Sequence, residues 1–200
     1  PKENSFNENR IALTPEAVGV MIANGHQVVV ETKAGDGASY TDKDYSEAGA
    51  KIAYDKKEVF ECDIIVKSAP VSEMECELLK PNQFIISPIH MAVMKREILQ
   101  KMMDKKITAL SFENLKDDSG HNPIVRSMSE IAGSAVMLIA GQYLSKTNNG
   151  KGVLVGGISG IPPTKVIIIG AGIVGEYAAR TALAMGGSVK VFDNNIYKLK

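Results

Sequence analysis

Two periodicities alternate along the first 115 residues of the chain. The segment TPEAVGVMIANG has the signals of a helix, because Thr14 can cap the first turn, Pro15 fits its first position and Gly25 stops it. Further helices are predicted at 42–50 and 91–106, and apolar runs predict strands at 27–31, 51–53, 63–69, 83–89 and 107–112. Strands that alternate with helices of this length predict a parallel sheet that is covered on both faces.

The pattern changes after the last of these strands. A polar loop at 113–123 is followed by a long apolar helix that we expect to begin at Ser127, because Ser127 and Glu130 have the spacing of a capping box. A glycine-rich loop then leads to a second strand–turn–helix–strand unit. The sequence therefore predicts a first domain at 1–126 and a second domain at 127–200.

Charge and cysteine content narrow the classes of partner. The chain has 23 basic and 23 acidic residues, and this balance argues against nucleic acid or an acidic membrane surface as the main partner. Cys62 and Cys76 form no CxxC pair and no histidine is spaced to join them, so we expect free buried thiols in a reducing cytoplasm and no bound metal. No signal peptide and no membrane-length apolar run is visible. Because the chain begins at Pro1 rather than Met, we also expect an incomplete N-terminus.

A nucleotide-binding motif lies near the end of the chain. Gly170, Gly172 and Gly175 form G-x-G-x-x-G between a strand at 165–169 and a helix, and Asp193 follows a second predicted strand at 188–192. The first glycine permits the tight turn, the second leaves room for a pyrophosphate at the helix N-terminus, and the third lets helix and strand pack closely. The alternative is a tight turn of the same kind that holds no ligand.

The residues that follow the second strand bear on the choice of cofactor. Asp193 lies where a carboxylate can bind the adenosine ribose, and its charge would repel a 2′-phosphate, so NAD is favoured over NADP. Lys198 is either a further ribose contact or a solvated lysine.

Several motifs occur in the order found in one family. ENRIALTPEAVGVMIANG, PIHMA, MSEIAGSAV and KVIIIGAGIVGEYAAR resemble alanine dehydrogenases and the related α-subunit of proton-translocating nicotinamide nucleotide transhydrogenase. The resemblance implies an α/β protein with two Rossmann-like, doubly wound parallel-sheet domains and an active site in the cleft between them. The second domain would be truncated here, with the rest of it, including the family's active-site aspartate, beyond Lys200.

The resemblance also assigns roles to residues of the first domain. Arg10 matches the arginine that binds the substrate carboxylate, and its alternative is a solvated arginine before a helix. His90 follows an apolar strand and matches the acid/base histidine, and its alternative is a hydrogen-bonded core histidine. Lys67 stands one place from the family's substrate-binding lysine, and a shift of one residue along a strand would turn it to the other face. His26 and His121 are interpreted as structural or solvated.

Ser129, on the long helix, matches a serine that contacts the cofactor, and its alternative is a serine that helps to cap the helix. The resemblance thus implies a cytoplasmic enzyme that oxidises L-alanine with NAD and water to pyruvate, ammonium and NADH. It implies a homo-oligomer, in this family a hexamer, without nucleic acid or membrane partners.

Two other functions compete with this reading. A transhydrogenase α-subunit would pass hydride to a partner's NADP, but those relatives generally lack a histidine at the position of His90, and their longer insertion before SxxAG is missing here. A non-catalytic binding module could also keep the fold, although the presence of both Arg10 and His90 argues against it.

Overall fold

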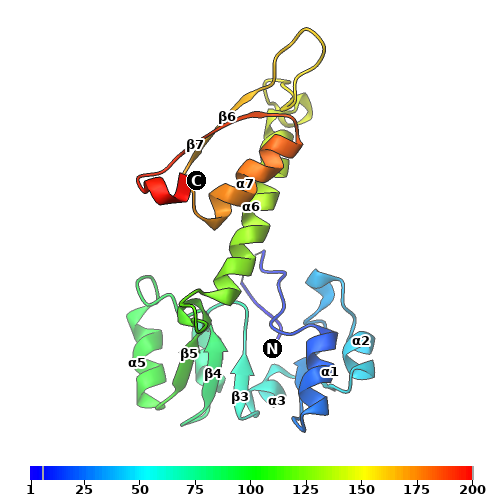
Figure 1. Cartoon of the computed structure of the whole chain (residues 1–200). Coiled ribbons are helices and arrows are strands. Elements are labelled where there is room, and N and C mark those ends of the chain that lie inside the picture. Colours follow the sequence, from blue (N-terminus) through cyan, green and yellow to red (C-terminus); the bar gives the residue numbers. More distant parts are fainter. Residues whose placement is uncertain (6, 200) are drawn as a thin grey trace. The chain divides into compact units, whose positions relative to one another are not determined.

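The computed structural model describes residues 1–5 and 7–199. They form two compact units, Pro1–Asn114 and Leu115–Lys200 (Figure 1). The contacts group most of the polar loop, from Leu115 on, and the whole long helix with the second unit, whereas the domain division proposed at residue 126 falls inside that helix. That finer division stays a prediction.

The strands of the first unit form two parallel sheets. β1 (Val29–Glu31) pairs with β2 (Lys51–Ala53), and β4 (Phe84–Ser87) lies between β3 (Ile64–Val66) and β5 (Thr108–Ser111). Together with the parallel sheet of the second unit, this confirms the predicted α/β class. The helices that connect or flank these strands are α1 (Pro15–Ala23), α2 (Asp42–Glu47), α3 (Lys56–Phe60), α4 (Glu73–Leu78) and α5 (Arg96–Asp104) (Figure 1).

Local signals set the limits of these helices. Thr14 caps α1 by accepting a hydrogen bond from the backbone N–H of Ala17, and Pro15 occupies the first turn, as predicted. Gly25 follows the helix at φ 86°, in the left-handed region where glycine carries no steric cost. α5 begins only at Arg96, because a turn closed on the carbonyl of His90 occupies the residues before it.

Apolar side chains of β3, β4 and the neighbouring helices form the larger core of the first unit. Ile65 and Ile85 are almost completely buried at its centre, with Phe60, Val71, Leu79, Ile89, Ile98 and Met102 around them. Both cysteines are free thiols, but only Cys76 is buried, and Cys62 is half-buried. Burial raises the pKa of both thiols, which keeps them protonated near neutral pH.

The second unit consists of two helices and a two-stranded parallel sheet. α6 (Pro123–Leu144) leads through a glycine-rich segment to β6 (Lys165–Ile169), α7 (Ile173–Ala184) and β7 (Ser188–Phe192). Short 3-10 helices lie at 36–38, 112–114, 146–148 and 196–199.

The predicted start of the long helix was wrong. α6 begins at Pro123, four residues before the predicted start, because proline lacks the N–H that a first helical residue leaves unpaired. The capping box does not form: the Ser127 hydroxyl donates to the carbonyl of Pro123, and Glu130 accepts from Arg126. Ser129 lies in the second turn and donates to the carbonyl of Val125, so it does not cap the helix.

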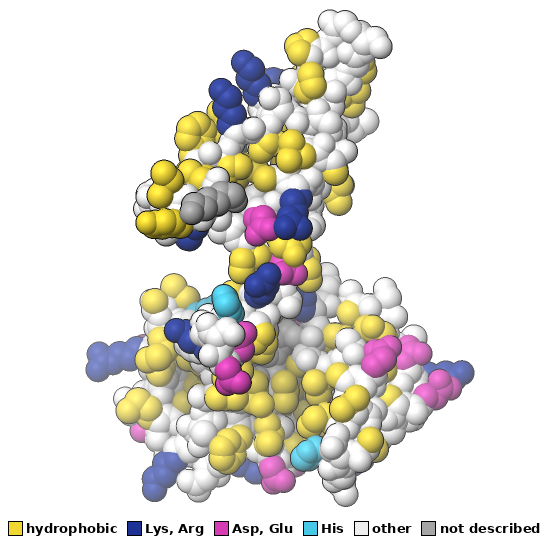
Figure 2. Space-filling view, viewed as in Figure 1, with side chains coloured by type: hydrophobic (Ala, Val, Ile, Leu, Met, Phe, Trp, Pro, Cys, Tyr) yellow, Lys and Arg dark blue, Asp and Glu magenta, His cyan; other side chains and the backbone are white. Residues whose placement is uncertain are grey.

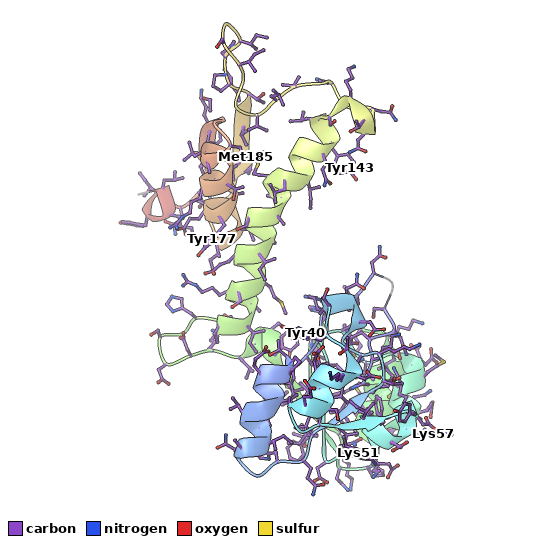
Figure 3. All side chains as sticks on the ribbon, turned by 90° about the vertical axis from the view of Figure 1, so that its right-hand side faces the viewer. Tyr40, Lys51, Lys57, Tyr143, Tyr177 and Met185 are labelled. Atoms are coloured by element: carbon purple, nitrogen blue, oxygen red, sulfur yellow. The ribbon has the colours of Figure 1, made fainter. Side chains whose placement is uncertain are left out.

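α6 and α7 pack against each other at a glycine. A Cβ on Gly133 would lie 2.5 Å from the carbonyl oxygen of Val174 and 2.7 Å from the Cβ of Tyr177. Tyr177 lies on α7 and Met185 at its end, where the helix runs beside α6 (Figure 3). The two helices can approach this closely only because position 133 has no side chain.

On the face shown in Figure 2, the second unit carries several patches of apolar side chains. On α6, Ile131, Leu138 and Tyr143 are all more than half exposed. By length and mean hydropathy, 1.3 over its best window, α6 also meets the minimum for a membrane-spanning helix. One such helix is weak evidence, because core helices of soluble proteins and signal sequences meet the same minimum.

Candidate active site

The glycine turn between β6 and α7 has the geometry that nucleotide binding requires. Gly170 adopts φ 105°, which L-residues rarely adopt, so the chain can turn sharply out of β6. Gly172 is the N-cap of α7, and a Cβ placed there would meet no atom within 4 Å. A Cβ on Gly175 would lie 1.9 Å from the carbonyl oxygen of Gly170. The shape of the turn therefore requires glycine at positions 170 and 175, whereas at position 172 the glycine leaves open space.

Asp193 is tied to this turn. One carboxylate oxygen accepts a hydrogen bond from the N–H of Ala171 at 2.7 Å, and the other accepts from Asn195 at 2.7 Å. These bonds lower the pKa of Asp193, so the carboxylate is charged near neutral pH. Because a carboxylate offers about four lone-pair sites, it keeps capacity for ribose hydroxyls.

A cavity of about 920 Å³ in the second unit joins the turn to α6. Its lining includes Gly170, Gly172 and Gly175 of the turn and Ser129 of α6. The open space at Gly172, the N-terminus of α7 and the Asp193 carboxylate fit the pyrophosphate and ribose of a dinucleotide. Lys198 lies exposed in the last 3-10 helix, and its attraction contributes to the lowered pKa of Asp193.

In the first unit, Arg10 is paired with a neighbouring carboxylate. Its Nε and Nη2 donate to the two oxygens of Glu8 at 2.8 and 2.5 Å, in a bidentate arrangement. The arginine side chain is 56% exposed and lines a cavity of about 630 Å³ between β1 and β3. The carboxylate of a substrate could thus reach Arg10 from solvent. It would either bind beside Glu8 or compete with Glu8 for the guanidinium group.

His90 stands three residues beyond the end of β4, where the carboxyl ends of parallel strands commonly form ligand sites. It adopts φ 46°, and its side chain is 54% exposed. Glu113, just after β5, accepts hydrogen bonds from the N–H groups of Ile89 and His90 at 2.9 and 2.8 Å. His90 is therefore an accessible residue in a constrained turn and not a core histidine.

Lys67 lies in an ion cluster of five residues, of which Lys67 and Glu75 are buried and Glu3, Lys56 and Glu31 are partly exposed. The Lys67 ammonium is 2.6 Å from a carboxylate oxygen of Glu3 and 3.0 Å from one of Glu75. Lys56 contacts the same oxygen of Glu75 at 3.2 Å and Glu31 at 3.6 Å. The Lys67 side chain is only 1% exposed, so its substrate-binding role, which stays a prediction, would require the cluster to open.

The cluster also fixes the loop after β3. The second oxygen of Glu3 accepts from the N–H groups of Ser68 and Ala69 at 2.6 and 3.2 Å. Burial by itself raises the pKa of Glu75, but the Lys67 charge and hydrogen bonds from Ser72 outweigh it and lower the pKa to about 2. The carboxylates that hold Lys67 are thus part of the local framework at the end of β3.

Sequence reasoning missed the glutamates that surround the expected site residues, namely Glu3, Glu8, Glu75 and Glu113. One signal was present, because SEME has the S-x-x-E spacing of a capping box, which Ser72 and Glu75 form at the start of α4. Among the expected residues, the structure gathers the three glycines, Asp193 and Ser129 around one part of the second unit. Arg10, Lys67 and His90 lie on separate loops of the first unit, with Lys67 and Arg10 each held by a carboxylate.

We expect alanine substitutions at Gly175 and Gly172 to act differently. Gly175→Ala forces its Cβ against the carbonyl of Gly170, so it should destabilise the second unit by about 1–3 kcal/mol. Gly172→Ala meets open space and should leave the melting temperature nearly unchanged, but its methyl group occupies the room left for the pyrophosphate. Thermal melts and NADH titrations of the full-length variants separate the two effects. Equal losses of stability in both variants would contradict the assigned roles.

Two family models match the chain in succession. The alanine dehydrogenase/PNT N-terminal domain matches residues 1–132, and the alanine dehydrogenase/PNT C-terminal domain matches residues 135–200. An alanine dehydrogenase of Methanococcus maripaludis is 40% identical over all 200 residues, which cover 53% of that protein. The chain therefore spans about half the length of the curated relatives it matches.

Two solved structures have the same fold as the whole chain. An L-alanine dehydrogenase matches with a TM-score of 0.94 and 34% identity, covering 100% of this chain and 55% of that one. A transhydrogenase from Sinorhizobium meliloti matches with a TM-score of 0.85 and 23% identity, covering 99% of this chain and 59% of that one. At that lower identity, the second match speaks for the fold alone.

Proposed function

Because the chain belongs to the alanine dehydrogenase/PNT family, we propose that the full-length protein oxidises L-alanine with NAD and water to pyruvate, ammonium, NADH and a proton. The coarser conclusion, an oxidoreductase related to alanine dehydrogenases, rests on relatives at 34–40% identity over the full chain. The observation that carries the choice within the family is His90, an exposed histidine at the carboxyl end of β4.

Each step of this reaction has a candidate group in the chain. Arg10 would bind the alanine carboxylate, since a guanidinium fork matches a carboxylate better than a lysine does. After the hydride has left the alanine Cα, His90 would take a proton from the water that adds to this carbon, and would return it to the leaving ammonia. NAD, when bound, accepts the hydride from the alanine Cα.

The cofactor preference rests on Asp193 and the space at Gly172. The carboxylate stands beside the turn, held by the N–H of Ala171, where it can accept hydrogen bonds from ribose hydroxyls. A 2′-phosphate at the same place would bring two negative charges together, so NADP should bind far more weakly.

We also propose a cytoplasmic homo-oligomer with the hexameric arrangement that the family resemblance implies. The exposed apolar side chains of α6, including Ile131 and Leu138, support burial of this helix against a second copy. Sedimentation of the full-length protein measures the oligomeric state directly.

The test of the function is a steady-state assay of the full-length protein. We expect NADH to form from L-alanine and NAD, and only slow turnover with NADP. Equal rates with the two cofactors would overturn the cofactor assignment. Inactivity with alanine together with hydride exchange between two nicotinamides would instead establish the transhydrogenase alternative.

A further inference from the structure

One carboxylate organises the turn that carries His90. Glu113 lies two residues beyond the end of β5, in the 3-10 helix at 112–114, and β5 pairs with β4 up to Ser87 and Ser111. Its Oε1 accepts hydrogen bonds from the N–H groups of Ile89 and His90, and lies 3.7 Å from Nδ1 of the His90 ring. The ends of two neighbouring strands are thus joined through a single side-chain atom.

The turn needs such a support. His90 has φ 46°, a left-handed conformation that costs a non-glycine residue free energy and persists only where surroundings impose it. Its carbonyl oxygen accepts from the N–H groups of Val93 and Met94, which closes the turn on the other side. The backbone of His90 is therefore held at both its N–H and its carbonyl.

We propose that Glu113 is the positioning residue for His90, holding the imidazole at the carboxyl end of β4 through the two backbone N–H groups. This rests on the proposed function, in which His90 moves protons. Burial alone raises the pKa of Glu113, but hydrogen bonds from Ser111 and the backbone N–H groups of His90, Glu113 and Ile89 lower it to about 2. The side chain is thus an ionised acceptor throughout the neutral range, and charged acceptors make the stronger hydrogen bonds.

Two substitutions distinguish the loss of the hydrogen-bond acceptor at residue 113 from the loss of its negative charge. Glu113→Gln keeps an oxygen that can accept from both N–H groups, whereas Glu113→Ala removes the acceptor. In the full-length protein we expect Glu113→Ala to lower kcat with alanine about 100-fold, because a displacement of about 1 Å can cost that much. The KM for NAD should not change. Glu113→Gln should stay within about threefold of the wild type, as should Glu97→Ala, an exposed glutamate at the start of α5.

A double-mutant cycle tests whether Glu113 acts through His90. In a His90→Ala background, Glu113→Ala should lower the residual rate by less than about threefold, because the group it positions is gone. A further 100-fold loss in that background would overturn the proposal, since it would indicate a general structural role.

Hydrogen–deuterium exchange of the peptide around Ile89 and His90 gives a readout that needs no activity. Exchange should accelerate most in Glu113→Ala, less in Glu113→Gln because a neutral amide oxygen is a weaker acceptor, and not at all in Glu97→Ala. If exchange were unchanged in Glu113→Ala, Glu113 would not hold the N–H groups of Ile89 and His90, and the proposal would be overturned whatever the kinetics show. If the wild type does not oxidise alanine, the proposed function fails, while the exchange measurement still decides whether Glu113 holds the turn.

Discussion

Replacement of His90 by alanine in the full-length protein should lower alanine turnover by about 10²- to 10⁴-fold, the usual contribution of a general acid/base. NADH affinity should remain close to that of the wild type, because His90 belongs to the first unit and the glycine turn to the second. The two quantities are measured by steady-state kinetics and by fluorescence titration of NADH.

Two further variants guard this result against a folding defect. Asparagine tolerates the left-handed conformation of residue 90 better than alanine, so His90→Asn should be folded and equally inactive. His121→Ala, at an exposed histidine paired with Asp117, should retain full activity. A His90 variant that turns over normally, or one that loses NADH binding instead, would rule out the acid/base assignment.

The largest loss of stability should follow from Lys67→Met. The substitution removes the lysine that contacts both Glu3 and Glu75, and leaves Lys56, at 3.2 Å from Glu75, as the remaining lysine of the cluster. Breaking a buried pair from one side costs about 3–5 kcal/mol, because the remaining charge keeps its desolvation penalty. The measurement is the free energy of unfolding of the full-length protein in urea.

The matched control is Lys51→Met on the same unit (Figure 3). Lys51 is 69% exposed and pairs with Glu58 at 3.2 Å, and such surface pairs contribute about 0–1 kcal/mol. If Lys67→Met unfolded no more readily than Lys51→Met and only raised the KM for alanine, Lys67 would be a substrate ligand and the ion cluster dispensable.

The second unit was largely predictable because its signals are local in sequence. The strands at 165–169 and 188–192 were predicted to the residue, since β-branched runs, glycines and the terminal Asp193 mark both ends. The start of α6 was missed because two signals competed. An S-x-x-E pattern at Ser127 matched a cap, while Pro123 at the earlier position began the helix.

The surroundings of the site residues in the first unit were not predictable in the same way. Lys67, Glu3 and Glu75 are separated along the chain and meet only once β3 and α4 have packed, so no periodicity reveals the cluster. Glu113 lies 23 residues from His90 and meets it only because β4 and β5 are neighbours in the sheet. The residue types indicated which side chains could take part in catalysis or binding. The glutamates that contact these side chains are set by the packing of segments that are distant in sequence.

Asp193 links the proposed cofactor preference to the structure of the glycine turn. The carboxylate that would reject a 2′-phosphate also anchors the N–H of Ala171 in the glycine turn. Exchanging it for a small neutral residue would admit the phosphate and release the turn in the same step. A lineage that switched to NADP would therefore need a compensating anchor for Ala171 before, or together with, the loss of the acid. For this reason, we expect that a single substitution at Asp193 would not give the full-length protein efficient use of NADP.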